Sequence, residues 1–479
     1  MKELGQFISS ISNGLYTYVL IALLVLGGLF FFIRTKCAPV RMIKEQFKSV
    51  SEKPKDKKGV SSFQALMVST ASRVGTGNII GVATAICLGG FGSVFWMWVI
   101  AIIGSASALI ESTLAQIYKK RGLDGCFGGP AYYIEKAFKA RVIAVVFSVL
   151  LILTYGVGFN MLASYNLQST FKYYSFYNPQ ISPWVIGAIV AILVGYCLLG
   201  GGKRVVKVTS FLVPIMGVLY ILVALVMVFA NIQNIPNVFV QIFNEAFNFK
   251  AIFGGIFSSC LIYGIKRGLF SNEAGVGSAP NASASADVSH PVKQGLVQVL
   301  SVFIDTIIIC SATAFMCMSS GVEITPAMKE DSALYVQAAL RATFGEFGPI
   351  FITISIVLFA FTTLLGNLFY VDKAFSHILG RDPSKNFKRA YYILFSLLIL
   401  VGASLNSGLL WDFADILMGL MTLINIPAII ILGKYAFGAI KDYSKQRKQG
   451  KDPTFIAKDI GLNDDLDYWQ AEQSDTAGE

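Results

Sequence analysis

The sequence predicts an all-α membrane protein with eleven transmembrane helices, and three observations support this prediction. Hydrophobic residues make up 55% of the 479 residues and charged residues only 14%, a composition typical of a chain that crosses a bilayer many times. Apolar runs of spanning length recur along the chain, and basic residues recur in alternate loops between them. The lipid bilayer is therefore the predicted surroundings of most of the chain.

Eleven apolar runs approach the length of about 20 residues that a helix needs to cross a bilayer. The runs are 15–33, 62–85, 91–118, 142–170, 183–200, 208–230, 252–284, 291–319, 348–378, 388–405 and 411–437. The first run is longer than the apolar part of a signal peptide and has no small-x-small cleavage site behind it. We therefore expect it to stay in the protein as a membrane anchor.

Basic residues mark one side of the predicted membrane. They cluster at 34–58, 119–121, 203–207, 381–389 and from Lys434 onward. The first of these loops holds nine cations and three acidic residues, and such loops stay in the cytoplasm. This places the N-terminus outside and the C-terminus inside a cell membrane, so the positive charge indicates orientation and not a nucleic-acid partner. The polar, acidic tail after Lys451 is expected to be mobile.

Ten of the spans divide into two sets of five when the first span is set aside. The sets cover 62–230 and 252–437. Because five is an odd number, the second set must enter the membrane with the opposite orientation, as in an inverted repeat. The expected units are an N-terminal helix with a basic loop (1–60), two five-helix repeats (61–230 and 231–440) and a cytoplasmic tail (441–479).

Polar, glycine-containing stretches interrupt the first span of each set. They are Gly-Thr-Gly-Asn at 75–78, and Tyr-Gly-Ile-Lys-Arg-Gly at 263–268 followed by the block 270–280. In hydrocarbon, backbone groups freed by such a break survive only where they line a protein cavity. Broken helices at matching positions of two inverted halves indicate the substrate site of a secondary transporter. Close packing is the alternative for the first stretch, since Gly77 and Gly81 form a small-xxx-small pair.

Four sequence motifs lie within the ten-span core. They are Val-Gly-Thr-Gly-Asn-Ile at 74–79, Gly-Gly-Pro-Ala-Tyr-Tyr-Ile at 128–134, Gly-Leu-Phe-Ser-Asn-Glu-Ala-Gly-Val-Gly-Ser-Ala-Pro at 268–280 and Phe-Ile-Asp-Thr at 303–306. By these motifs the chain resembles the alanine or glycine:cation symporter family of the APC superfamily. The resemblance implies a LeuT-type 5+5 inverted repeat preceded by one extra N-terminal helix. It also implies sodium-coupled symport of a small neutral amino acid, alanine or glycine and possibly serine or glutamine, by alternating access.

An amino acid is a zwitterion, so its site needs hydrogen-bond donors for the carboxylate and acceptors for the ammonium. The expected donors are the backbone amides of Thr76 and Gly77 with the side chain of Asn78. The expected acceptors are carbonyls freed near Gly264 and Ile265. The predicted substrate-binding residues, with Ile265 and the two aromatic side chains as pocket walls, are Gly75, Thr76, Gly77, Asn78, Ala163, Tyr263, Gly264, Ile265 and Phe270.

Two positions differ from the family pattern. Ala163 stands where many relatives have a glutamine, shortly after the pair Phe159-Asn160, and Asn367 stands where a tryptophan is frequent. Both positions are expected to border the pocket. A smaller side chain there enlarges the cavity, so glutamine or another larger neutral amino acid stays open as a substrate.

Sodium prefers neutral or anionic oxygen ligands. By resemblance to the shared fold, its ligands would be the carbonyls of Ala71 and Val74 and the hydroxyls of Thr362 and Thr363. The alternative for both threonines is a hydrogen bond to a carbonyl one turn earlier, which is common in membrane helices. Sodium is the expected co-transported ion.

Charged residues within the spans need partners, because a lone charge deep in a bilayer costs several kcal/mol. Arg73 lies about 18 Å along the helix from Ser61, at a rise of about 1.5 Å per residue. We expect it to form a structural or gating ion pair with one of the acids Glu111, Glu273 and Asp305.

Other classes of function are less well supported. The chain has two histidines, and its seven cysteines lack metal-binding spacing, so neither a metal centre nor a histidine-based enzyme is expected. The first rival is a proton-coupled carrier of the same fold that uses Asp305 or Glu111, and the second is an amino-acid-gated channel or sensor. No obligate protein partner is evident.

Overall fold

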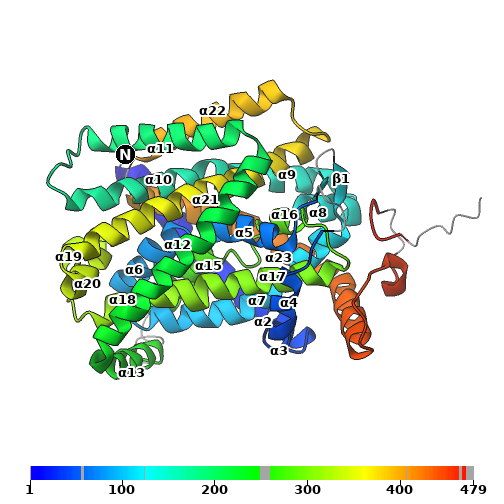
Figure 1. Ribbon diagram of the computed structural model, residues 1–479, viewed down its shortest axis with the longest axis horizontal. Helices are drawn as coiled ribbons and strands as arrows, with labels where there is room; N and C mark the ends of the chain where they lie inside the picture. Colours follow the sequence, from blue (N-terminus) through cyan, green and yellow to red (C-terminus); the bar gives the residue numbers. More distant parts are fainter. Residues whose placement is uncertain are drawn as a thin grey trace, which may run out of the picture.

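The computed structural model (Figure 1) describes residues 2–54, 59–122, 125–248, 259–405, 407–462 and 466–470. Residues 55–58 of the predicted basic loop and the start of the predicted span 252–284 lie outside this range. Within the described residues, eight helices are long and apolar enough to cross a membrane, or nine when one bent pair is included.

The elements are almost entirely helical. The first part of the chain forms α1 (Lys2–Leu15), η1 (Tyr16–Leu20), α2 (Ile21–Arg34), α3 (Ala38–Arg41), α4 (Ile43–Val50), α5 (Ser62–Arg73), η2 (Gly77–Gly81), α6 (Val82–Thr84), η3 (Ala85–Gly89) and α7 (Ser93–Ile117). The middle part forms β1 (Lys120–Gly122), β2 (Gly125–Phe127), α8 (Pro130–Phe138), α9 (Arg141–Leu151), η4 (Ile152–Gly158), α10 (Phe159–Ser169), η5 (Thr170–Tyr173), α11 (Ser182–Leu199), α12 (Gly202–Ala230), η6 (Ile232–Asn234) and α13 (Ile235–Ala246). The last part forms α15 (Ser259–Asn272), α16 (Pro280–Ser283), α17 (Pro291–Val302), η7 (Phe303–Cys310), α18 (Ser311–Ser319), α19 (Pro326–Glu330), α20 (Ala333–Phe344), α21 (Phe347–Leu379), α22 (Lys385–Gly402), α23 (Ser407–Lys448) and η8 (Ala457–Ile460). The short antiparallel hairpin β1–β2 is a small exception to the predicted all-α class.

Every predicted span overlaps a helix of the described residues, but two of these helices do not pass the length and composition test for a span. One is α15, which begins at Ser259, the first residue that the structure describes after residue 248. The other is α22, whose 18 residues carry three cations near its start. A multi-pass membrane protein with about eight or nine apolar helices is therefore established, whereas the count of eleven and the 5+5 division stay predictions.

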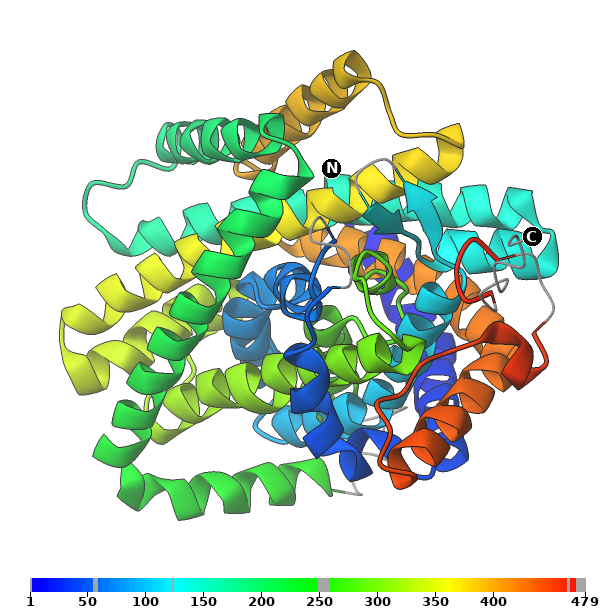
Figure 2. The same cartoon turned by 45° about the vertical axis from the view of Figure 1, so that its right-hand side comes forward.

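The broken helix lies at the centre of the bundle. In both Figure 1 and Figure 2, α5 lies among α12, α17 and α21, while α11 and α22 lie side by side at the periphery. Burial follows the same order, since 72% of the α7 span is buried inside the protein but only 28% of the α11 span. The sequence explains the difference, because α7 carries small and polar residues along its length whereas α11 is almost uniformly apolar and suits a lipid-facing position.

The C-terminal tail is packed, contrary to the expectation of mobility, as far as the structure describes it. Phe455, Leu462 and Leu466 are buried, and Asp467 forms an ion pair with Lys120 at the start of β1 (2.8 Å). In Figure 2 the red C-terminal segment lies close to the cyan segments that include this hairpin. Apolar residues spaced within the polar tail supply the buried surface that holds it.

Trp469 anchors the end of the described tail. Its indole N–H donates to the carbonyl of Gln116 at the end of α7 (2.8 Å), and its ring lies 4.7 Å from the ammonium of Lys119. Together these contacts contribute about 2 kcal/mol.

Replacing Trp469 with alanine is therefore expected to raise the rate of limited proteolysis in the tail by about tenfold or more. The cleavage rate of the purified protein measures this, with Trp184→Ala in the lipid-exposed α11 as the matched control. Equal cleavage rates for the two variants would show that Trp469 does not hold the tail.

Candidate functional site

The first predicted break is confirmed. Helix α5 ends at Arg73, and the chain bends by 53° before it continues as Gly77–Gly89. Val74 leaves the helical region with ψ at 87°, and the backbone amides of Thr76 and Gly77 have no hydrogen-bond acceptor among the described residues. Two adjacent amides with free hydrogens therefore lie within the membrane-spanning core, where an anion would satisfy them.

Asn78 holds this break in place. Its side-chain oxygen accepts a hydrogen bond from the Gly75 amide (2.8 Å), and its side-chain nitrogen donates to Asp305 Oδ1 (2.6 Å) and to Ser271 Oγ (2.9 Å). The side chain is thus engaged by the protein itself. It supports the free amides from behind instead of offering a free donor of its own.

The second predicted break is wrong in position. Helix α15 runs without interruption through Gly264, Ile265 and Gly268 to Asn272, so the carbonyls near Gly264 and Ile265 are used within the helix. A side chain at Gly264 would lie 2.5 Å from the carbonyl oxygen of Ser93, and one at Gly268 would lie 2.7 Å from Ile100. These two glycines allow α15 to pack closely against α7, as small residues four apart do in membranes.

The second break begins after Asn272. Glu273, Gly275 and Gly277 have φ values of 52°, 86° and 93°, a region that favours glycine and ends a helix. The amide of Ala274 donates to the side chain of Asn272 (3.0 Å), and that of Gly275 donates to Glu111 (3.3 Å). These amides are therefore diverted from the last turn of α15.

The carbonyls of Phe270 and Ser271 consequently have no backbone donor among the described residues. They take the place of Gly264 and Ile265 as candidate acceptors for an ammonium group. The two breaks also face each other, since Ser72 donates to Glu273 (3.4 Å) and Asn78 donates to Ser271. The sequence signal for this arrangement was the block 270–280, in which closely spaced glycines precede Pro280.

Aromatic side chains cover the first break. A side chain at Gly77 would lie 2.9 Å from the ring of Phe270, and that ring lies 4.5 Å from Phe159 and 4.7 Å from Trp411, measured between ring centroids. The Phe270 ring thus lies at the first break, where the sequence predicted a pocket wall. Trp411 was not among the residues predicted to line the site.

Ala163 lies on the face of α10 that points toward the first break. Phe159, Ala163 and Asn166 are spaced i, i+4 and i+7, which places them on one side of a helix. Phe159 contacts Phe270, and Asn166 donates to the hydroxyl of Thr76 (3.0 Å). Ala163 therefore lies between two residues that border the site.

Two predicted wall residues lie elsewhere. Ile265 lines a groove between α2, α7 and α15, and the Cβ atom of Tyr263 lies against Gly89 at the far end of η3. Both lie one or two turns of α15 before Phe270, the residue of this helix that meets Gly77. The structure therefore does not bring them to the first break.

Two of the four predicted sodium ligands are in contact, and a third, Val74, lies in the loop that follows. The hydroxyl of Thr363 on α21 donates to the carbonyl of Ala71 (3.1 Å), and a side chain at Gly75 would overlap with that hydroxyl. The carbonyl of Val74, in the same loop, has no donor among the described residues. Thr362 has the alternative geometry instead, because its hydroxyl donates to the carbonyls of Leu358 and Phe359, both at 3.1 Å.

Arg73 does not form the expected ion pair. It donates to the side-chain oxygen of Gln298 (3.0 Å) and to the Gln298 carbonyl (3.4 Å), and its Nε and Nη2 atoms have no hydrogen-bond partner among the described residues. The three candidate acids interact with it electrostatically at longer range and are hydrogen-bonded to neutral donors; they are Glu111, Glu273 and Asp305. Arg73 thus interacts with the three acids at longer range, and not with one adjacent carboxylate as predicted.

Asn367 joins three helices behind the site. Ser72 on α5 donates to its side-chain oxygen (2.6 Å), and its side-chain nitrogen donates to Asn160 on α10 (2.9 Å). The short amide at this position is thus a hydrogen-bonded link between α5, α10 and α21. From the sequence, Asn367 was expected to border the pocket and enlarge it.

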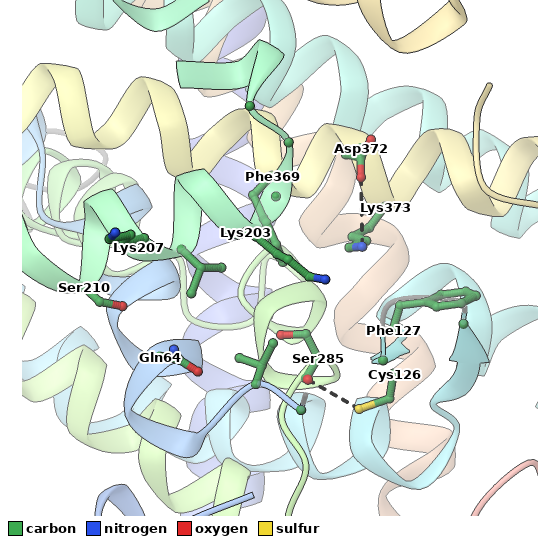
Figure 3. Close-up of a pocket in the computed structure, with 18 of the residues that line it drawn as sticks. Gln64, Cys126, Phe127, Lys203, Lys207, Ser210, Ser285, Phe369, Asp372 and Lys373 are labelled. Carbon is green, nitrogen blue, oxygen red and sulfur yellow. Dashed lines mark hydrogen bonds and ion pairs between the residues drawn. The ribbon is translucent and has the colours of Figure 1, made fainter. Parts of the chain in front are cut away.

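A pocket of about 760 Å³ opens at the end of the bundle that carries the basic loops (Figure 3). Gln64 of α5, Lys203 of α12 and Phe369 of α21 line it, together with the β1–β2 hairpin. Phe369 follows Thr363 by six residues and Gln64 precedes Ala71 by seven, which is roughly 10 Å of helix. The pocket therefore adjoins the two helices that make the Ala71–Thr363 contact.

Comparisons with known proteins identify the family of the chain. The model of the sodium:alanine symporter family matches residues 1–457. The chain is 43% identical over 458 residues to the amino-acid carrier protein AlsT of Bacillus subtilis, covering 96% of this chain and 95% of that protein. It is 41% identical over 479 residues to the probable sodium/glutamine symporter GlnT of the same organism, covering 99% and 98%. The crystal structure of MhsT in complex with L-phenylalanine matches with a TM-score of 0.55 at 13% identity, over 84% of this chain and 95% of that one, which is a likeness of fold.

Proposed function

This chain belongs to the sodium:alanine symporter family, and we propose that it imports a small neutral amino acid together with sodium by alternating access. Its relatives are named as carriers and symporters and not as enzymes. The single observation that carries the proposal is the Thr363–Ala71 hydrogen bond beside the free amides of Thr76 and Gly77. A sodium ion and a carboxylate can be held there by adjacent parts of one broken helix.

The substrate carboxylate is assigned to the amides of Thr76 and Gly77, with Gly75 and Asn78 shaping the loop. The ammonium is assigned to the carbonyls of Phe270 and Ser271 at the facing break. The close approach of the Phe270 ring to Gly77 supports a small side chain, and glutamine stays a candidate because Ala163 leaves room on the α10 face.

Sodium is assigned to the carbonyls of Ala71 and Val74 and the hydroxyl of Thr363. The sequence-based assignment of Thr362 has weaker support because of its back-bonded hydroxyl. Since sodium and substrate share the loop after α5, each stabilises the arrangement that the other needs, which is the proposed coupling. One sodium ion descending 100 mV supplies about 2.3 kcal/mol and a tenfold gradient about 1.4 kcal/mol, enough for several hundredfold accumulation.

The pocket in Figure 3 is assigned to the cytoplasmic release route. Its lysines follow the positive-inside pattern, and the orientation with the N-terminus outside rests on that pattern. Gln64 and Phe369 line the pocket on the two helices that hold the proposed sodium site. Movement of α5 relative to α21 would connect the pocket with the proposed sodium site.

Replacing external sodium with choline at constant pH is expected to reduce alanine uptake into proteoliposomes at least tenfold. The buried acids Glu111, Glu273 and Asp305 make proton coupling the rival, so a control with an imposed pH gradient and no sodium belongs in the same experiment. Uptake that persists in choline and follows the pH gradient would show that protons, and not sodium, drive transport. Counterflow of labelled against unlabelled alanine excludes a channel, which cannot exchange substrate in this way.

A further inference from the structure

A buried cluster of charges lies next to the aromatic cover of the first break. Arg267 on α15 is 4% exposed and Asp415 on α23 is fully buried. The guanidinium donates to Asp415 Oδ2 (2.7 Å), and its central carbon lies 4.1 Å from the centre of the Trp411 ring. Charges this deep in a membrane protein mark functional positions by default.

The hydrogen-bonding capacity of this pair is only partly used. Nε and Nη1 of Arg267 and Oδ1 of Asp415 are buried and have no hydrogen-bond partner among the described residues. The Trp411 ring attracts the positive charge but supplies no oxygen acceptor. Leaving charged donors unsatisfied is costly, so the geometry favours a ligand that carries its own oxygen atoms.

A second cation would still balance the charge of Asp415 if the Arg267 guanidinium bound a ligand. Lys266 lies 3.4 Å from the same Oδ2 atom, but its ammonium otherwise faces the N-terminal helix, where Ser12 lies at 3.2 Å and Asn13 at 3.3 Å. The two adjacent cations therefore have different surroundings. Arg267 faces the aromatic residues at the break, and Lys266 faces away from them.

Arg267 is one turn away from the aromatic wall of the substrate site. It precedes Phe270 by three residues on α15, and residues with this spacing share a helix face. A side chain at Gly81 would contact both Trp411 (3.5 Å) and Arg267 (3.9 Å), just as one at Gly77 would contact Phe270. Along both helices, Arg267 thus lies beyond Phe270 on the side away from the basic loops.

We propose that Arg267, oriented by Asp415 and Trp411, forms an outer binding site for the carboxylate of the amino acid, which receives it before it passes Phe270. The guanidinium matches a carboxylate in two-pronged geometry, and the free oxygen of Asp415 is an acceptor for the ammonium. This inference rests on the proposed transport function and adds a second site to it. Direct passage from outside to the Thr76 and Gly77 amides would not require Arg267.

The test uses the full-length protein in proteoliposomes and compares inhibition of labelled alanine uptake by alanine and by alaninamide, which lacks the carboxylate. Arg267→Gln is expected to weaken inhibition by alanine about tenfold or more and inhibition by alaninamide less than twofold. The matched control Lys266→Gln removes the same charge from the next residue and is expected to change both values less than threefold. Arg267→Lys keeps the charge but loses the two-pronged guanidinium geometry. It is expected to reduce the preference for alanine over alaninamide as an inhibitor at least threefold.

The outer site would be overturned if Arg267→Gln weakened inhibition by alanine and by alaninamide equally. It would also be overturned if Lys266→Gln weakened inhibition by alanine as much as Arg267→Gln does. Either result indicates a general effect of charge or packing. If Arg267→Gln does not fold, an unchanged preference in Arg267→Lys would overturn it as well. Dependence of wild-type uptake on chloride, with gluconate as the replacement and with the preference unchanged in the variants, would assign the cluster to an inorganic anion instead. Wild-type sodium-driven alanine uptake in the same vesicles tests the proposed function separately.

Discussion

Replacing Asn78 with alanine is expected to lower alanine transport by about a hundredfold or more while the protein still reaches the membrane. The substitution removes the acceptor of the Gly75 amide and one donor to the buried Asp305 carboxylate. A hydrogen bond to a charged group contributes about 1.5–3 kcal/mol, and a buried group left without its partner costs a similar amount. The loop that presents the Thr76 and Gly77 amides would lose its support. The geometry of the proposed substrate site would therefore change before the fold as a whole does.

Initial rates of uptake in proteoliposomes with a known amount of protein measure this effect. Asn166→Ala is the matched control, because Asn166 donates to the Thr76 hydroxyl but makes no hydrogen bond to the backbone of the break. A loss of less than tenfold is expected for the control. Near wild-type transport by Asn78→Ala would show that the break does not depend on this side chain.

Replacing Thr363 with alanine is expected to raise the sodium concentration for half-maximal transport about tenfold. The hydroxyl touches the Ala71 carbonyl and lies against Gly75, so the variant removes one oxygen from the proposed ion site. A lost neutral ligand of this kind costs about 1–2 kcal/mol, which corresponds to a factor of about ten.

Thr362→Ala is the control for this experiment. It removes the same atoms from the neighbouring residue, but there the hydroxyl is bonded to Leu358 and Phe359 of its own helix. We expect its sodium dependence to change less than threefold. Equal shifts in the two variants would favour the original assignment of both threonines, and wild-type sodium affinity in Thr363→Ala would remove Thr363 from the site.

The first break could be predicted from the sequence because its cause is local. A polar Gly-Thr-Gly-Asn run within an apolar span favours a break, and the backbone groups that a break frees are stable only where they are satisfied inside the protein. The second break could be placed only within a range. Glycine serves both to end a helix and to let two helices touch, and the neighbouring α7 decides that Gly264 and Gly268 do the latter while Gly275 and Gly277 do the former.

Side-chain directions were beyond the sequence for similar reasons. Successive residues of a helix are turned by about 100°, so Thr362 and Thr363 point in different directions, and the tertiary packing places Thr363 against α5. Arg73 shows that a buried cation does not need an adjacent acid when a neutral acceptor such as Gln298 and several acids at longer range are present. The buried tail likewise depends on Trp469 meeting Gln116, a contact between residues 353 positions apart.

Binding of alanine to the purified protein, titrated at several sodium concentrations by calorimetry, tests the central claim most directly. Because linkage is reciprocal, sodium should raise the affinity for alanine about tenfold or more, alanine should raise the affinity for sodium by the same factor, and Thr363→Ala should reduce both effects. The same alanine affinity in sodium and in choline would contradict the claim that ion and substrate share the broken helix.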